Sequence, residues 1–451
     1  MTSTGGRTHA SLRRTNIYYR IQGEWADTVS SGIEPGEAAK VFGALESGRL
    51  DHLFTAANTE YYGREGFESL RFGVGVPRES VWRLISAIRR STGLLVLESA
   101  WGDFQVRVTP TAQLMQALYE IDTWSARSLL SKTELPADEE WIVQDRLLVE
   151  EAVLVALAKT QAKDPSESEL IGARAEVISA LYDGTAPASE AGVIAARFYD
   201  TMRALPDALS QPITPEYVME VHRRLREGEP DAGVLRSTDT PVSQPAPQGT
   251  PPARILRELQ AMQAYAESQD VPFVHPLIKT LALAWWIRRV QPFDEYNSVV
   301  SRLISMAYAL RYGYHVIGII DSDQQLQVQV DDDEDLTARF IGQLKTVARS
   351  NEFVESELKR RLARYREVVP RFAHLGINHR QALILDRALR APETEFTIKH
   401  HAHTRSLGYE TARQDFTKLV TAGLMEHRRQ GKAFIFRLAH DAEKKLAKRL
   451  P

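Results

Sequence analysis

The segment from Gln291 to Tyr296 is the part of this sequence whose residue types and position are best suited to bind a ligand or catalyse a reaction. It reads QPFDEY and stands between two long apolar segments, so it is expected to form a polar loop at the centre of the protein. Such a loop at the start of a buried helix is typical of anion sites, because the first backbone N–H groups of a helix lack internal partners and the helix dipole favours negative charge there. A turn between helices that binds no ligand is the alternative interpretation.

Two buried helices are predicted to position this loop. Residues 275–290 and 303–314 are apolar on nearly every face, which is typical of buried helices. Pro292 ends the first helix, and Asn297 or Ser298 is predicted to cap the second.

The pattern of the whole chain predicts a mainly α fold in three parts. Residues 1–110 form a mixed α+β region with a polar leader (1–15), a helix (80–90) and a hairpin (94–110). Residues 111–368 form a helical domain, because apolar residues recur there with a spacing near 3.6. Its other predicted helices cover 111–130, 138–162, 166–184, 188–205, 214–228, 253–269 and 336–350.

Residues 369–451 predict a winged helix-turn-helix domain, with three helices and then a hairpin around Gln430 and Gly431. The recognition helix covers 409–422, with Ala412, Phe416, Leu419 and Val420 facing inward. The candidate DNA-binding residues face outward: Arg413, Gln414 and Lys418 on this helix, and Arg428, Arg429 and Lys432 on the wing. Such a domain can instead bind a protein or dimerise.

Charge separates this last part from the rest. Residues 370–451 hold 16 Lys and Arg against 8 Asp and Glu, which gives +8, so residues 1–369 carry −11 of the total of −3. This asymmetry favours a polyanion partner for the basic part, or attraction between the two parts.

Composition excludes several classes of site and protein. The chain has no cysteine, which excludes disulfides, thiol catalysis and zinc fingers. No apolar run reaches the roughly 20 residues of a membrane helix, and the N-terminus has no secretory pattern, so we expect a cytoplasmic protein that does not bind membranes. The acidic run 331–335 is predicted to open a helix rather than to bind calcium. His400, His401 and His403 are predicted to lie in a solvated turn rather than at a metal.

The segment from Gln291 to Arg302 resembles the signature of the Fic (Fido) family of nucleotidyltransferases, H-P-F-x-D/E-G-N-G-R-x-x-R. The resemblance extends to YVMEVHRRLREG, AGVLRSTDT and HPLIKTLALAWW before the loop, and to NTEYYGREGFESLRF near the N-terminus. The C-terminal part is similar to the winged-helix tail of a large bacterial Fic subgroup. The resemblance therefore covers most of the chain and implies an all-helical Fic core.

The family transfers AMP from ATP to a protein hydroxyl, with magnesium as cofactor. The resemblance implies that Glu295 holds magnesium. It also implies that Asn297, Ser298, Arg302 and Arg236 contact the nucleotide, and that Gln291 stands at the position of the catalytic base. A homodimer is also plausible on this basis.

The chain departs from the family pattern at several positions. Gln291 replaces the basic histidine, and an amide has no usable proton affinity near pH 7. Tyr296 and Ser298 replace glycines, and Val299 replaces an arginine. Many family members are inhibited by a helix of pattern S/T-x-x-x-E-G/N, whose glutamate pairs with the second arginine of the signature. Here Val155 stands at the serine position and Lys159 at the glutamate position, so we expect Lys159 to repel Arg302. Residues 238–252 correspond to the flap, the segment that pairs with the backbone of the target protein in active family members. They include prolines at 241, 245 and 247, which have no N–H to donate to a paired strand.

Three interpretations follow from these departures. The first is a pseudoenzyme that acts by binding other molecules. In this interpretation Glu295 and Arg302 pair with each other, and the winged domain contacts DNA or protein. The second is a sensor that binds a nucleotide without catalysis. The third is a rewired transferase whose base comes from Asp294, Tyr296 or the substrate.

Overall fold

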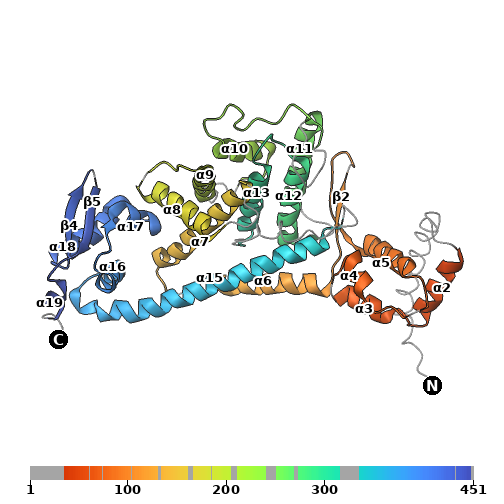
Figure 1. Ribbon diagram of the computed structural model, residues 1–451, viewed down its shortest axis with the longest axis horizontal. Coiled ribbons are helices and arrows are strands. Elements are labelled where there is room, and N and C mark those ends of the chain that lie inside the picture. The colour runs from red at the N-terminus through yellow and green to blue at the C-terminus, as the bar shows by residue number, and fades with distance from the viewer. Residues whose placement is uncertain are drawn as a thin grey trace, which may run out of the picture.

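The computed structural model describes residues 35–59, 61–73, 75–102, 104–130, 134–160, 166–183, 185–204, 211–239, 250–268, 273–314, 335–431 and 433–447. The predicted leader, the three flap prolines, Lys432 and most of the acidic run lie outside these residues. Figure 1 shows an N-terminal lobe, a central group of helices and a C-terminal domain in chain order.

The N-terminal lobe is helical and has its own core. It consists of α2 (Pro35–Glu46), α3 (Asp51–Thr59), α4 (Arg64–Ser69) and α5 (Arg78–Thr92), which bury residues such as Leu50, Leu53, Phe67 and Leu84. The predicted helix over 80–90 is thus confirmed within α5. The predicted hairpin is also present as antiparallel strands β1 (Leu94–Glu98) and β2 (Gln105–Val108), and its inner residues join the core of the central helices.

The central helices confirm the mainly α prediction. They are α6 (Ala112–Leu130), α7 (Ala137–Lys159), α8 (Glu167–Asp183), α9 (Glu190–Ala204), α10 (Pro215–Leu225), α11 (Pro252–Glu267), α12 (Pro276–Val290) and α13 (Asn297–Arg311). Thr214 caps α10 by accepting a hydrogen bond from the Tyr217 N–H at 3.1 Å. Helices α12 and α13 pack on each other at the centre, as their apolar sequences predict.

Helix α15 (Thr337–Arg371) is longer than predicted. It runs for 35 residues, past the predicted end at 350, so the predicted domain border at 368–369 falls inside it. Its first half packs on α6, and its second half lies against the C-terminal domain, where Val368 is fully buried. The extension is stabilised by these contacts and by ion pairs of Glu357 and Arg361 with α7.

The C-terminal domain has the element order predicted for a winged helix-turn-helix. Helices α16 (His379–Arg390), α17 (Ile398–Thr404) and α18 (Tyr409–Thr421) precede strands β4 (Met425–Gln430) and β5 (Ala433–Leu438). The short strand β3 (Phe396–Thr397) completes a sheet of order β3-β5-β4, and the chain then forms α19 (Ala442–Ala447).

This domain contacts α7 through charged groups. At the start of α7, Asp138 accepts hydrogen bonds from His379 at 2.9 Å and Arg405 at 2.8 Å. The next residue, Glu139, contacts Arg405 as well and pairs with Arg361 of α15 at 2.8 Å. The expected attraction between the acidic and basic parts of the chain is therefore observed as a defined interface.

The domain's histidines do not lie in a solvated turn, so that prediction is wrong. His401 is buried and lies 3.0 Å from an Asp415 oxygen, while His403 lies 3.0 Å from the Tyr199 hydroxyl of α9. The reason is that α17 faces the domain core on one side and α8 and α9 on the other. No described group of three or more His, Asp or Glu residues is arranged to hold a metal.

The described helices include none that is both long and apolar enough to cross a membrane.

Candidate functional site

The loop between α12 and α13 contains two strained residues. Gln291, which ends α12, has a φ of 49°, and Tyr296, which precedes α13, has a φ of 62°. Left-handed backbone costs a non-glycine residue roughly 1–2 kcal/mol, so neighbouring groups must hold this conformation.

Arg236 supplies much of that support. Its side chain is buried, and burial lowers the pKa of its guanidinium. The guanidinium donates to the Gln291 carbonyl oxygen at 2.6 Å, and the Arg236 backbone N–H donates to the Pro292 carbonyl at 3.0 Å. It donates further to the carbonyl oxygens of Thr238, Val290 and Thr250. The structure thus places this arginine on the backbone of the loop and its flanks.

Asn297 closes the loop instead of capping the helix. Its Oδ1 accepts from the Phe293 N–H at 3.0 Å, and its Nδ2 donates to the Phe293 carbonyl at 2.7 Å. Ser298 is exposed, and Tyr296 holds the N-cap position without a side-chain cap bond. The predicted cap by Asn297 or Ser298 is therefore wrong, because left-handed Tyr296 turns the Asn297 amide back toward Phe293.

Tyr296 is largely buried in the loop and is only 8% exposed. The Lys159 Nζ and the Arg226 guanidinium carbon each lie 5.2 Å from its centroid, within cation–π range. Burial raises the pKa of the Tyr296 hydroxyl, and Arg226 opposes this shift. Lys159, which was expected to repel Arg302, thus lies over the aromatic ring of Tyr296.

Arg302 forms a buried ion pair with Glu151 of α7. The Arg302 Nε lies 2.5 Å from the Glu151 Oε1, and the two side chains are 6% and 1% exposed. The predicted pair between Glu295 and Arg302 is wrong. Glu295 lies in the exposed loop, whereas Arg302 lies more than a turn inside α13 and faces α7.

Glu295 instead takes part in an ion pair at the surface. Its carboxylate lies 3.2 Å from an Arg226 nitrogen, and another nitrogen of Arg226 lies 2.8 Å from Asp231. Glu295, the carboxylate expected to hold magnesium, therefore already pairs with an arginine, although its side chain remains 54% exposed.

His222 packs against the loop through Phe293. Its ring stacks on Phe293 with centroids 3.8 Å apart, and its Nδ1 accepts from the Gly233 N–H at 3.0 Å. Burial lowers the pKa of His222 to about 4, so the ring is neutral near pH 7 and packs as an aromatic group.

The residues of this site do not fit ATP and magnesium as the family pattern requires. The Asn297 amide bonds the loop, Arg302 is paired with a carboxylate, and Tyr296 fills the place of a glycine. Phosphate binding needs unpaired donors and close backbone approach, and both are reduced here.

Glu151 and Arg226 were not predicted as site residues. A signal for Glu151 exists, since it is a charged residue inside the apolar stretch VEEAVLVALA. A charge inside an apolar stretch is expected to be buried and to need a partner, so the sequence marks this residue as a candidate. The identity of the partner is set by the tertiary fold. No comparable signal distinguishes Arg226 from the other arginines around it.

The candidate DNA-binding residues that the structure describes are exposed on the C-terminal domain. Arg413, Gln414 and Lys418 are exposed on α18, while Ala412, Phe416 and Leu419 are fully buried, as predicted. Two of these cations have carboxylate partners: Arg413 pairs with Glu410 at 2.7 Å and Arg428 with Glu395 at 2.7 Å. Arg429 is exposed on β4.

Comparison with solved structures finds similar folds. A Fic family protein from Desulfovibrio desulfuricans is 16% identical, with a TM-score of 0.43 over 75% of this chain and 99% of its own. A Fic domain-containing signaling protein from Bacteroides thetaiotaomicron is 12% identical, with a TM-score of 0.41 over 55% of this chain and 97% of its own. Fic-1 from C. elegans is 16% identical, with a TM-score of 0.44 over 63% of this chain and 76% of its own. No family model matches the sequence, and no curated protein matches it.

Proposed function

We propose that this chain is a degenerate Fic-type protein that transfers no nucleotide and acts by binding other molecules. The spacing of the segment from Gln291 to Arg302 supports the resemblance to the family. The identity of Gln291 removes the base that would accept the proton of an attacking hydroxyl. Loss of a general base alone typically lowers a rate by about 10² to 10⁴.

The observation that carries this proposal is the buried pair of Arg302 and Glu151. An arginine that clamps phosphate must exchange its present partner for the ligand, and here the partner is a carboxylate that is 1% exposed. Release of Arg302 would leave Glu151 buried without its cation, at a cost of several kcal/mol. The pair therefore opposes nucleotide binding even before the loss of the base is considered.

The first test is incubation with labelled ATP and magnesium, alone and with candidate protein substrates. Neither the wild-type protein nor Gln291→His should transfer label, because restoring the base does not release Arg302 or remove the Tyr296 ring. Transfer by the wild type would support the rewired transferase. Transfer by Gln291→His alone would show that the missing base was the only defect.

The second test is calorimetry with ATP, ADP and CTP. The proposal predicts no measurable heat for any of them. Saturable binding by the wild type that is lost in the double variant Arg302→Met with Glu151→Leu would favour the nucleotide-sensing interpretation instead.

A second candidate function is DNA binding by the C-terminal domain. It is supported by the outward position of Arg413, Gln414 and Lys418 on α18, which is the helix that reads the major groove in winged helix-turn-helix domains. A mobility-shift assay should show binding that weakens steeply with salt, because phosphate contacts release counterions. Arg429→Ala should weaken it, whereas Arg366→Ala on α15 should not. Absence of a shift, or a shift that does not depend on salt, would leave proteins as the partners of this face.

A further inference from the structure

We propose that the acidic start of α7 competes with DNA for basic side chains of the C-terminal domain and so holds this domain in a docked state of low DNA affinity. The inference rests on the second candidate function above, DNA binding by the winged helix-turn-helix domain. It assigns to the contacts of Asp138 and Glu139 a regulatory role in addition to their role in stability.

Basic side chains from two elements of the domain meet at these carboxylates. His379, the first residue of α16, lies 2.9 Å from Asp138, and Arg405, which directly follows α17, lies 2.8 Å from the same carboxylate. Arg405 also contacts Glu139. The side chains of Arg405, Asp138 and Glu139 are only 8%, 12% and 3% exposed, so this contact excludes most of the solvent.

The covered side of the domain includes the end of the helix that precedes the recognition helix. In helix-turn-helix domains the recognition helix enters the major groove, while the preceding helix crosses the DNA backbone. That preceding helix is α17 here, and Figure 1 shows it on the side of the domain that faces α8. In its last turn, His403 lies 3.0 Å from the Tyr199 hydroxyl of α9 and 3.1 Å from a nitrogen of Arg203. The end of α17 therefore contacts the central helices.

A carboxylate and a phosphate are alternative partners for the same cation, because both accept the paired donors of a guanidinium. DNA must displace α7 before Arg405 can contact a phosphate, since Asp138 and Glu139 already enclose this side chain. Arg413 on α18 is half exposed in the docked state. The docked domain thus presents side chains that read bases but lacks phosphate contacts, which supply a large share of DNA affinity.

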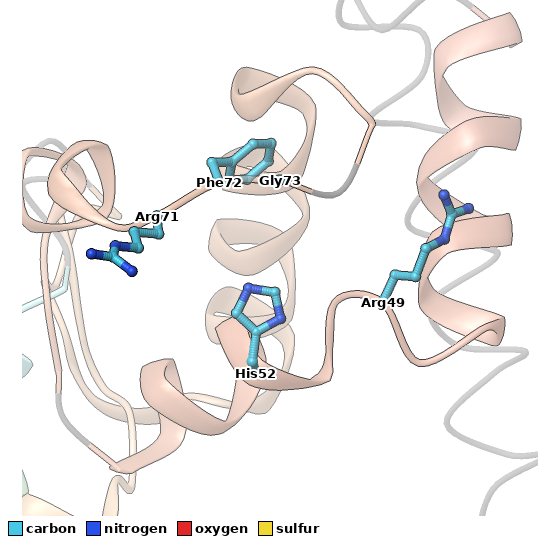
Figure 2. Close-up of a pocket in the computed structure, with 5 residues that line it drawn as sticks. All are labelled: Arg49, His52, Arg71, Phe72 and Gly73. Atoms are coloured by element: carbon cyan, nitrogen blue, oxygen red, sulfur yellow. The ribbon is translucent and has the colours of Figure 1, made fainter.

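The basic side chains of the N-terminal lobe are arranged differently. Figure 2 shows Arg49 and Arg71 at the border of an open depression, with their guanidinium groups pointing apart. These two groups do not converge on one anion, whereas His379 and Arg405 share one carboxylate. Because His379 and Arg405 belong to the same domain, they stay close together after release from α7 and can share a phosphate instead.

The test compares the wild-type chain with the double variant Asp138→Asn and Glu139→Gln, using a fluorescent DNA duplex of mixed sequence. These changes keep the shape of both side chains and remove their charges. The variant should bind DNA about 5- to 150-fold more tightly at low salt, the range of typical coupling between sites. Its salt dependence should also be steeper, by about 0.9 in the slope of log K against log salt for each added phosphate contact.

Glu134→Gln with Glu140→Gln is the matched control, because it removes the same charge beside the start of α7. Glu134 pairs with Arg366 of α15 at the surface, and Glu140 directly follows Glu139. The control should keep the salt slope of the wild type. An equal increase of affinity in the control would show that net charge alone is responsible and would overturn the inference.

Equal affinity and equal slope of the wild type and the Asp138→Asn, Glu139→Gln variant would overturn the inference and leave DNA binding in place. Absence of binding by the wild type and by both variants would overturn DNA binding, and the inference with it.

Hydrogen exchange gives a second measurement that needs no variant. Saturating DNA should raise exchange at the start of α7 in the wild type, because coupling between two sites is reciprocal. Exchange in α12 and α13 should stay unchanged, since the central core remains folded. Protection of the start of α7 by DNA would overturn the inference.

Discussion

Helix α7 has one charge cluster at its first turn and another in its second half, and the two clusters share their charges differently. At its start, Asp138 and Glu139 contact three basic side chains: His379, Arg405 and Arg361. Further along, Glu151 pairs with Arg302 in the central core. The first cluster joins two domains through shared partners, whereas the contact of Glu151 and Arg302 joins two helices of the central core.

This difference predicts different responses to mutation. A cluster with shared partners keeps some charge compensation when one member is removed, whereas removal of one partner of a buried ion pair typically costs about 3–5 kcal/mol. The first cluster should therefore lose part of its stability after a single change, and the second should lose most of it.

The largest effect is expected for Arg302→Ala. It removes the guanidinium that pairs with Glu151, a carboxylate at 1% exposure, so the free energy of unfolding of the core should fall by about 3–5 kcal/mol. Urea unfolding followed by tryptophan fluorescence measures this, because Trp285 and Trp286 lie on α12 in the same core. The double change Arg302→Met with Glu151→Leu should recover most of the loss, since two apolar groups replace the pair. A single variant as stable as the wild type would show that the pair is not buried in solution.

A smaller effect is expected for Arg405→Ala. Asp138 keeps His379 and Glu139 keeps Arg361, so the loss should be about 1.5–3 kcal/mol, the range for a hydrogen bond to a charged group. Hydrogen exchange should rise in α17 and at the start of α7 but not in α13.

Arg366→Ala serves as the control for this prediction. Arg366 pairs with Glu134 at the surface, with both side chains more than half exposed, so its loss should cost less than about 1 kcal/mol. Equal effects of Arg366→Ala and Arg405→Ala would mean that the interface at Asp138 is solvated.

The sequence predicts the elements of both clusters but not their partners. Amphipathic spacing places α7, α12 and α13, and it correctly assigns the buried face of α18. Arg302 and Glu151, however, are 151 residues apart, and Arg405 and Asp138 are 267 apart. Local pattern carries no information about which of many charges meet at such separations, so the predicted Glu295–Arg302 pair was wrong.

The predicted solvated turn at His400 to His403 failed for the same reason. The segment is short and polar, which favours exposure when only its neighbours in sequence are considered. His401 is covered by Asp415 and Phe416 of α18, and His403 contacts Tyr199 of α9, so both environments are properties of the assembled fold.

Acidification should loosen the interface between the domains. Burial lowers the pKa of His403 to about 4, with Arg203 and Lys399 contributing in the same direction. Because this is below the value of about 6.5 in unfolded chains, the unfolded state binds the proton more tightly. The contribution of neutral His403 is therefore complete above pH 6.5 and is lost as the pH falls toward 4.

Hydrogen exchange in α17 between pH 7 and pH 4.5, corrected for intrinsic rates, measures this loosening. His403→Gln should remove much of the dependence on pH, because an amide can accept a hydrogen bond without titrating. His222 also has a pKa of about 4, but it lies under the loop, so its protonation should instead destabilise α10 and α12. An unchanged pH dependence in His403→Gln would assign the effect to another group.

The smallest expected effect is that of Lys159→Met at the end of α7. The change removes a cation 5.2 Å from the Tyr296 centroid but retains an unbranched apolar side chain, so it should cost about 0.5–1 kcal/mol. Urea unfolding of the core measures this, with Lys359→Met on α15 as the exposed control that should cost less. A larger loss, near that of Arg302→Ala, would show that Lys159 and the Glu151–Arg302 pair form one network. The contrast between the two ends of α7 would then disappear.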